Sequence, residues 1–559
     1  MVKTMTKRFC LRPLAAALVA GLGLGMSATD AAASVRIAVS TVDDAGSIDT
    51  CTLRQAIAAM NDDGDTNGSA CIASTISGVD TIVFDTATFP PGGANTITLA
   101  DVADNQLAIT SPNLLIDASA NGNVTVQRPP AATNAFGIFY ASTPDGALTI
   151  DSLTIANGKL IAAQPSGAAL GAGIASVYTS LTLRNCVVTG NVISTSGYAA
   201  GGGVFVYAAD LMLASSTVAN NSVSGNSAAS GMGGGVFVRQ NIETQAGGNA
   251  TIIDSRILDN IAHGNGGGLH VGGALVMTSS SVSGNSAGRD GGGIKLYGVS
   301  ALTGSTISGN TATNNGGGIV AAGGYYGAPA ALLTLDASTL SGNSVTSTSG
   351  SRGGGIFTRI GNLSFINSTI AGNSAATSGY GYGGGIYVKQ NTYPITMRQT
   401  TIASNTAARR GGGLMIMTAG SGAVTFNGNL FANTAAPSDG GGNIAVTTGS
   451  IAIAGVDDLV FAGKPQPSDV INAIFSTTPI NGDPLLGSLA NNGGPTQTMQ
   501  PGMGSAAINA ANCADAPAID QRGMIRPDPA SRGLMTPCDI GAVEADSVAD
   551  LIFANGFDS

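Results

Sequence analysis

Several residue types are scarce in this 559-residue chain, and each shortage narrows what the protein can be. Trp is absent, only two His are present, and charged residues make up 10% of the chain, with a formal net charge of −10. Neutralising nucleic-acid phosphates requires a basic stripe, and no run of Lys and Arg supplies one. The composition therefore predicts no nucleic-acid partner.

Long apolar runs are missing beyond the N-terminus. Residues 1–33 combine a basic start, an apolar run over Pro13–Ala28 and the small residues Ala31–Ala33, a pattern that predicts a signal peptide. No later segment has 18 consecutive apolar residues, so we expect no transmembrane segment in the mature chain. The sequence therefore predicts an exported protein, either extracellular or associated with the outer membrane or cell surface of a Gram-negative-type bacterium.

Cysteine is also rare, with six in all, one of them in the predicted signal peptide. Export would permit disulfides. The pairs that are close in sequence are Cys51 with Cys71 and Cys513 with Cys538, which would leave Cys186 as a small buried residue. Five cysteines also allow other connectivities, so this pairing is a hypothesis.

Glycine is abundant, with 82 residues, and much of it lies in a repeat. Ser281–Asn285 is followed six residues later by Gly291-Gly292-Gly293, and the same arrangement recurs 25 residues on, from Thr306. Triple-Gly segments begin at residues 201, 233, 266, 291, 316, 353, 383, 411 and 440, and an Asn precedes most of them, at 191, 226, 260, 285, 310, 343, 373, 405 and 433. A period in this range indicates a solenoid.

The repeat unit suits short strands and tight corners. β-Branched residues alternate beside the Asn, no helical apolar period runs through residues 174–446, and glycine permits positive φ at corners. Asn residues stacked from coil to coil would form amide ladders. We therefore predict an all-β, right-handed parallel β-helix with an N-terminal cap containing a short helix and a C-terminal cap.

Two terminal segments and the repeats resemble known families. Cys51–Ile57 reads CTLRQAI, and this segment, followed by Asp80–Phe84, resembles the CSLREA-type domain. Thr52 and Gln55 also have capping-box spacing. Asn492–Thr496, Asp520–Gly523 and Cys538–Glu544 resemble the choice-of-anchor Q domain, which implies a C-terminal cap. The repeats over about 172–446 resemble those of polymorphic outer membrane proteins, and the final residues resemble the IFxxGF tails of exported proteins.

These observations predict five segments. They are the signal peptide (1–33), a CSLREA-like cap with the first coils (34–135), the β-helix repeats (136–460), an anchor-Q-like cap (461–545), and a linker with the C-terminal tail (546–559).

Candidate sites are few. Asp259, His263 and His270 fall in adjacent coils and are the best candidates for a catalytic cluster. A structural role for both His is the competing interpretation, because no galacturonase, nucleophile-elbow or zinc-protease motif is present.

Binding residues are suggested by the inserted corners. Tyr325, Tyr326, Tyr380 and Tyr382 lie in Gly-rich insertions, where tyrosines make adaptable surfaces for sugars or proteins. Arg409 and Arg410 read as a lone, solvated basic pair.

One metal site is suggested. Asp63, Asp65 and Asn67 match the first half of a calcium loop, but position twelve is Ser rather than Glu, so a polar turn explains them equally well. Calcium apart, no cofactor is expected.

The sequence favours a monomeric, adhesin-like module that binds carbohydrate or a surface protein without catalysis. A polysaccharide-degrading lyase or glycosidase is the alternative, and a structural surface spacer is the third. Relatives of this repeat type imply a C-terminal barrel, but too few residues follow Val446 for one.

Overall fold

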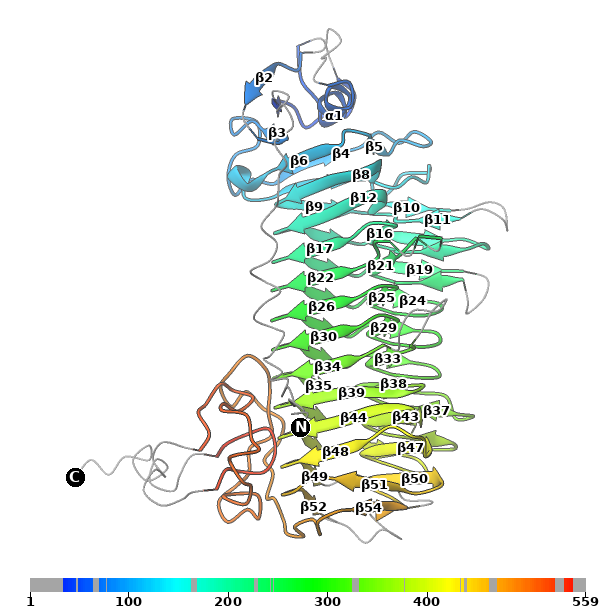
Figure 1. The fold of residues 1–559 in the computed structure, drawn as a ribbon. Coiled ribbons are helices and arrows are strands. Elements are labelled where there is room, and N and C mark those ends of the chain that lie inside the picture. The colour runs from blue at the N-terminus through cyan, green and yellow to red at the C-terminus, as the bar shows by residue number, and fades with distance from the viewer. Residues whose placement is uncertain are drawn as a thin grey trace, which may run out of the picture.

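The computed structural model describes residues 34–545, except 47–48, 64–69, 77, 162–167, 226–229, 242, 245, 324–330, 377, 433, 437–439, 462–469 and 528–536. The chain winds into a long rod of stacked coils, with its N-terminal cap at one end (Figure 1). Nearly all strand pairs are parallel, and each strand pairs with its counterpart in the next coil. The predicted all-β parallel β-helix is therefore confirmed.

The rod has four rows of strands, taken in turn by each coil. The first row, which carries the candidate site, contains β5 (Leu107–Ile109), β16 (Val204–Tyr207), β21 (Val236–Arg239), β25 (Leu269–Val271), β29 (Ile294–Leu296), β33 (Ile319–Ala321), β38 (Ile356–Thr358), β43 (Ile386–Gln390), β47 (Leu414–Thr418), β50 (Ile444–Thr448) and β53 (Val470–Ile471). The second row contains β6 (Asn113–Asp117), β17 (Leu211–Ala214), β22 (Ala250–Ile253), β26 (Leu275–Thr278), β30 (Ser300–Thr303), β34 (Leu333–Asp336), β39 (Gly361–Ile366), β44 (Tyr393–Arg398), β48 (Val424–Asn427), β51 (Ile451–Ala454) and β54 (Ala473–Phe475). Two long strands, β8 (Phe139–Asp151) and β12 (Ile174–Arg184), span both rows.

The other two rows complete the coil. The third contains β4 (Asn95–Thr98), β7 (Val124–Gln127), β9 (Leu153–Ala156), β13 (Val187–Thr189), β18 (Thr217–Ala219), β23 (Arg256–Leu258), β27 (Ser281–Ser283), β31 (Thr306–Ser308), β35 (Thr339–Ser341), β40 (Thr369–Ala371), β45 (Thr401–Ala403), β49 (Leu430–Ala432) and β52 (Leu459–Phe461). The fourth contains β10 (Lys159–Leu160), β14 (Val192–Ser194), β19 (Ser222–Ser224), β24 (Ile261–Ala262), β28 (Ser286–Ala287), β32 (Thr311–Ala312), β36 (Ser344–Val345), β41 (Ser374–Ala375) and β46 (Thr406–Ala407). Short strands precede some Gly corners: β11 (Ala169–Leu170), β15 (Ala199–Ala200), β20 (Gly231–Met232), β37 (Ser351–Arg352) and β42 (Gly381–Tyr382).

Stacked Asn side chains hold the corner between the third and fourth rows. Asn285 is buried, and its Nδ2 donates to Asn310 Oδ1 at 2.9 Å and to Ile257 O at 2.9 Å. The same bonds recur from coil to coil, so the predicted amide ladder is present. Its rung between Asn191 and Asn260 is Asn221; the predicted Asn226 and Asn433 lie outside the described residues.

The N-terminal cap contains the helix α1 (Leu53–Asn61), beside β1 (Ser34–Val39), β2 (Ala73–Ile76) and β3 (Asp80–Phe84). Its capping box is formed as predicted, because Gln55 N donates to Thr52 Oγ1 at 3.1 Å and Thr52 N donates to Gln55 Oε1 at 3.0 Å. Leu53, Ile57 and Met60 are among its buried residues. Of the helices that the structure describes, none has the length and apolar character of a membrane span.

The C-terminal unit packs along the flank of the last coils, beside the lower part of the rod in Figure 1. Gln521 is buried there, donates to Thr339 Oγ1 at 2.9 Å, and accepts from Thr369 Oγ1 at 2.6 Å. Inside the unit, Arg526 Nη1 pairs with Glu544 Oε2 at 2.9 Å. The C-terminal segment thus covers the third row of strands rather than extending the rod.

Both predicted disulfides are formed, Cys51–Cys71 in the N-terminal cap and Cys513–Cys538 in the C-terminal unit. Cys186 is free and buried, and burial raises the pKa of its thiol to about 12. Two disulfides indicate an oxidising compartment and therefore an exported protein.

Candidate functional site: a cationic groove on the first row of strands

The triple-Gly segments create a concave corner along the rod. At Gly291 φ is +69°, and an added Cβ would lie 3.1 Å from Lys295 Cβ and 2.6 Å from Ile294 O. At Gly316 an added Cβ would lie 2.4 Å from Val320 Cγ2. The outward-facing side chain four residues later therefore folds back onto the glycine. This side chain therefore lies in a hollow. Lys295, for example, is only 8% exposed although it points away from the core.

Equivalent residues of successive coils line up in this corner. The corner row, just before each triple Gly, contains Asn265, Asp290, Asn315, Arg352, Tyr382 and Arg410. The floor row, on the strands, contains His270, Lys295, Val320, Phe357, Tyr387 and Met415. The outer row, two residues further on, contains Tyr297, Ala322, Arg359, Lys389 and Met417. These three rows, with the neighbouring residues Arg289, Tyr380 and Arg409 that line the same hollow, form what we call the cationic groove.

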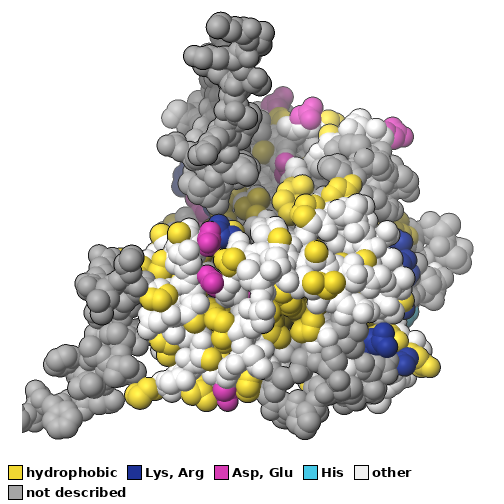
Figure 2. Space-filling model, turned by 60° about the horizontal axis from the view of Figure 1, so that its bottom comes forward, with side chains coloured by type: hydrophobic (Ala, Val, Ile, Leu, Met, Phe, Trp, Pro, Cys, Tyr) yellow, Lys and Arg dark blue, Asp and Glu magenta, His cyan; other side chains and the backbone are white. Residues whose placement is uncertain are grey.

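The groove consists of two adjoining hollows of about 530 and 370 Å³, which share Arg352, Tyr387 and Met417. Their lining includes seven cations, Arg289, Lys295, Arg352, Arg359, Lys389, Arg409 and Arg410, and one carboxylate, Asp290. The whole chain has 23 Lys and Arg against 33 Asp and Glu, so the groove reverses the charge balance of the molecule. In the view along the rod's end in Figure 2, dark blue Lys and Arg atoms gather at the right-hand edge of a mostly uncharged surface.

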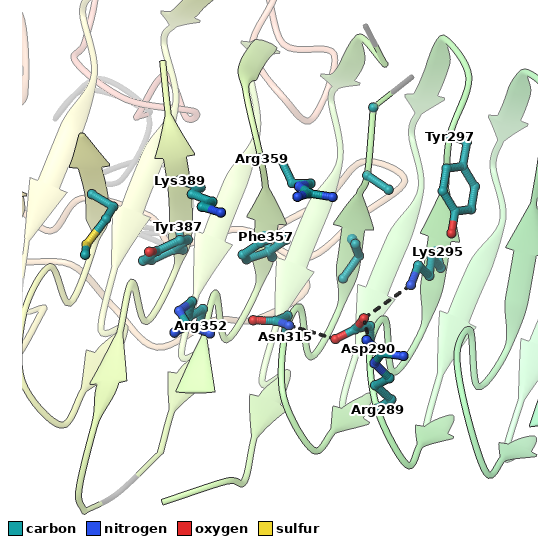
Figure 3. Close-up of a pocket in the computed structure, with 14 residues that line it drawn as sticks. Arg289, Asp290, Lys295, Tyr297, Asn315, Arg352, Phe357, Arg359, Tyr387 and Lys389 are labelled. Atoms are coloured by element: carbon teal, nitrogen blue, oxygen red, sulfur yellow. Dashed lines mark hydrogen bonds and ion pairs between the residues drawn. The ribbon is translucent and has the colours of Figure 1, made fainter. Parts of the chain in front are cut away.

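A buried ion pair anchors one end of the groove (Figure 3). Lys295 Nζ lies 3.2 Å from Asp290 Oδ2 and donates to Asn265 Oδ1 at 3.0 Å, while Asn315 Nδ2 donates to Asp290 Oδ1 at 2.7 Å. Burial lowers the pKa of Lys295, and the Asp290 carboxylate opposes that effect. The Oδ1 of Asn315 has no hydrogen-bond partner among the described residues, which leaves an acceptor in the groove lining.

His270 marks the boundary of the groove toward the N-terminus. Its ring stacks on Phe237 with centroids 4.7 Å apart and is tilted against Tyr297 at 5.6 Å. Burial, with a smaller contribution from the charge of Lys295, lowers the pKa of His270 to about 3. The ring is therefore neutral at physiological pH and acts as part of an aromatic stack.

Aromatic rings and arginines alternate toward the other end. Phe357 and Tyr387 stack at 5.5 Å with an interplanar angle of 6°. The Arg409 guanidinium lies 4.8 Å from the centroid of the Tyr380 ring and donates to the Tyr382 hydroxyl at 3.2 Å. Arg409 and Arg410 therefore belong to the groove, and their interpretation as a lone solvated pair is wrong.

The predicted catalytic residues do not come together. Asp259 is exposed at the end of β23, His263 is exposed after β24, and His270 is buried in β25, so they occupy three different rows of the coil. No hydrogen bond joins any two of these three described residues.

The predicted binding residues divide into two groups. Tyr380 and Tyr382 line the groove, whereas Tyr325 and Tyr326 lie outside the described residues. The calcium candidates Asp65 and Asn67 also lie outside them, and Asp63 is described with φ of +55°.

The groove cations were missed because each coil supplies only one to three of them, far apart in sequence. The expectation that the chain has no basic stripe is wrong, since stacking assembles one; the absence of a nucleic-acid partner stays a prediction. The signal was present in the repeat itself. The three rows follow directly when the triple-Gly segments are aligned. The residue before each segment gives the corner row, and the residues four and six positions after its first Gly give the floor and outer rows.

One comparison with known proteins, a family model, agrees with the fold. The family model described as "Right handed beta helix region" matches residues 136–331. No curated protein matches the chain. Among solved structures, pectate lyase Pel9A is 12% identical, with 91% of this chain and 96% of that chain covered at a TM-score of 0.35. The periplasmic alginate epimerase AlgG is 9% identical, with 85% and 100% covered at a TM-score of 0.28.

Proposed function

We propose that this protein is an exported, monomeric carbohydrate-binding module of the cell surface or its surroundings, and that its groove binds an extended acidic polysaccharide of the uronate type. The observation that carries the proposal is the lining of the two adjoining hollows, which has seven cations against one carboxylate. Five of the seven are Arg, whose planar guanidinium suits bidentate contact with carboxylates. Because coils repeat about every 4.8 Å, the cations face a polymer whose charges also recur at short intervals.

The aromatic residues favour a glycan over a nucleic acid. Binding of single-stranded nucleic acid relies on exposed ring faces on which bases stack. Here Phe357 and Tyr387 stack on each other, and Arg409 covers the face of Tyr380. Ring edges and tyrosine hydroxyls remain for contact with sugars.

One observation favours a second candidate, a lyase that cleaves the same polymer. Lys295 has a pKa lowered by burial and lies in the groove lining beside Tyr297, and such a lysine suits general-base chemistry. Its bonds to Asp290 and Asn265 oppose this role, because they hold the ammonium form.

The experiment is direct binding with product analysis. Protein from residue 34 onward is titrated by calorimetry with alginate, polygalacturonate and neutral cellulose oligosaccharides, and the same samples are assayed for unsaturated uronate products. We expect binding of the two uronate polymers, no binding of the neutral one, and no products. Products that are lost in Lys295→Met would establish the lyase, whereas absence of binding to every acidic polymer would contradict the proposal and favour a spacer.

A further inference from the structure

The first row of strands continues toward the N-terminus as a second, uncharged section. From Tyr140 the floor row runs in register through Ala175, Phe205 and Phe237 to His270, where the cationic groove begins. The outer row runs from Val177 through Tyr207 to Arg239. Neither row carries a charge before Arg239, so the two sections share one track but differ in chemistry.

Tyrosines are brought to the surface of this section. Tyr140 and Tyr207 are partly buried and pack on the cluster of Ala175, Ala200, Phe205 and Phe237. Tyr178 is 42% exposed, and its ring meets that of Tyr207 edge-on at 5.6 Å. Phe205 and Phe237 stack beneath at 5.6 Å with an interplanar angle of 4°.

A local backbone irregularity places Tyr178. The pairing of β12 with β8 shifts register between Val177 and Thr179, because the three residues 143–145 of β8 lie opposite the single residue Tyr178. The bulge is therefore on β8, and the φ of Tyr178 beside it is +61°. Positive φ is unfavourable for a bulky residue, and bulges commonly redirect a side chain at functional sites. The buried Thr179 hydroxyl fixes the bulge, since Thr143 N donates to it at 2.7 Å and it donates to Thr143 O at 2.9 Å.

We infer that this tyrosine section, Tyr140, Tyr178 and Tyr207, is a second carbohydrate subsite, which takes neutral sugar residues of the same polysaccharide whose uronates lie in the cationic groove. The inference rests on the proposed function. The exposed parts of the tyrosine rings offer surface to the C–H faces of sugars, and their hydroxyls can meet the polar groups. Neither row carries a charge between Tyr140 and Phe237 that would require an anion. A single polymer can reach both sections because the rows are continuous. The ligand of the protein is then an acidic polysaccharide in which neutral sugars separate the uronates.

Two probes separate the sections. Alginate contains only uronates, whereas gellan has neutral sugars between its glucuronates. We expect Tyr178→Ala/Tyr207→Ala to weaken gellan binding about tenfold and to leave alginate binding unchanged. Tyr393→Ala is the matched control, because Tyr393 is 41% exposed on β44 and lines neither hollow of the groove.

The outcomes are distinguishable. If the wild type binds gellan and the double variant binds it equally well, the tyrosine subsite is wrong while the groove stands. If neither polymer binds the wild type, the proposed function itself fails. Sedimentation velocity tests whether a second copy of the chain binds the tyrosines instead of a sugar. A wild-type dimer that becomes a monomer in the double variant would assign the tyrosines to that second copy and overturn the inference.

Discussion

Lys295 and Asp290 show how single residues set the character of the groove. Each side chain is nearly buried, at 10% and 12% exposure, and each satisfies the other at 3.2 Å. Neither would be stable alone in this position, because an unpaired buried charge costs several kcal/mol. The ion pair thus holds the Lys295 cation in the floor row, whereas two other cations of the groove, Arg359 and Lys389, lie in the outer row.

The two partners are expected to respond unequally to mutation. Asp290→Ala leaves the Lys295 ammonium buried without an ion-pair partner and should destabilise the fold by about 3 kcal/mol. Lys295→Met should cost less, roughly 1 kcal/mol, because Asp290 is not left alone: Arg289 Nε lies 3.7 Å from its Oδ2 and Asn315 Nδ2 still donates to its Oδ1. The midpoint of urea unfolding measures both. Equal costs for the two variants would show that the pair is not buried as described.

Asp458 predicts how stability depends on pH. Its carboxylate accepts hydrogen bonds from Asn429 N and Nδ2 at 2.9 and 3.0 Å, and burial raises its pKa from 3.8 to about 7. The folded carboxyl then keeps its proton up to about pH 7, whereas the unfolded one loses it near pH 4. Between these values the folded state binds more protons, so stability should fall as pH rises.

Asp458→Asn tests this dependence, because the amide oxygen can accept the same two bonds without ionising. We expect the variant to be more stable than the wild type at pH 8, by roughly 2–4 kcal/mol, and the gap to close toward pH 4. Urea midpoints across this range measure the difference. A gap that stays constant with pH would contradict the assignment.

At the level of the element, the coil depends on glycines for two separate reasons. The first glycine of each triplet has positive φ, as at Gly291 and Gly316, which turns the corner. The second has ordinary φ but no room: a Cβ at Gly292 would lie 2.4 Å from Gly317 O and 2.5 Å from Thr311 O. The close approach of neighbouring coils therefore requires a residue without a side chain.

A matched pair of substitutions separates these reasons. Gly292→Ala should destabilise the protein by about 3 kcal/mol or more, because backbone atoms of the next coil cannot yield easily. Gly309→Ala should cost about 1 kcal/mol, because φ there is +63° but the nearest atom lies 4.0 Å away. Thermal unfolding of both variants provides the comparison, and a larger loss at Gly309 would refute it.

The repeat made the coil predictable, whereas the groove becomes visible only when successive coils are aligned on their glycines. The Asn–Gly period, the short strands and the helix with Thr52 as its cap follow from local patterns. The groove depends instead on register between coils separated by 25 to 39 residues, for example Ser255 to Ser280 and Asn221 to Asn260. Insertions at the corners vary this spacing, so Arg352 and Asn315 become neighbours only once the glycines are superimposed.

At the scale of the whole molecule, the rod leaves the face that carries the groove open. The C-terminal unit covers the third row of strands through Gln521, and the N-terminal cap covers one end, whereas the first row stays open along the cationic groove. The chain carries a formal net charge of −10, so the groove is a local exception on an acidic rod. An acidic polymer would therefore be attracted to this face and repelled elsewhere.

The most direct test of this account compares charge reversal inside and outside the groove. Arg359→Glu/Lys389→Glu reverses two outer-row cations, and Arg36→Glu/Arg256→Glu reverses two exposed cations away from it, for the same change in net charge. Alginate affinity is measured by calorimetry at two salt concentrations. We expect the groove variant to lose at least tenfold in affinity and most of the salt dependence, and the control to bind within about twofold of the wild type. Equal losses in the two variants would show that net charge, not the groove, binds the polymer, and would contradict the account.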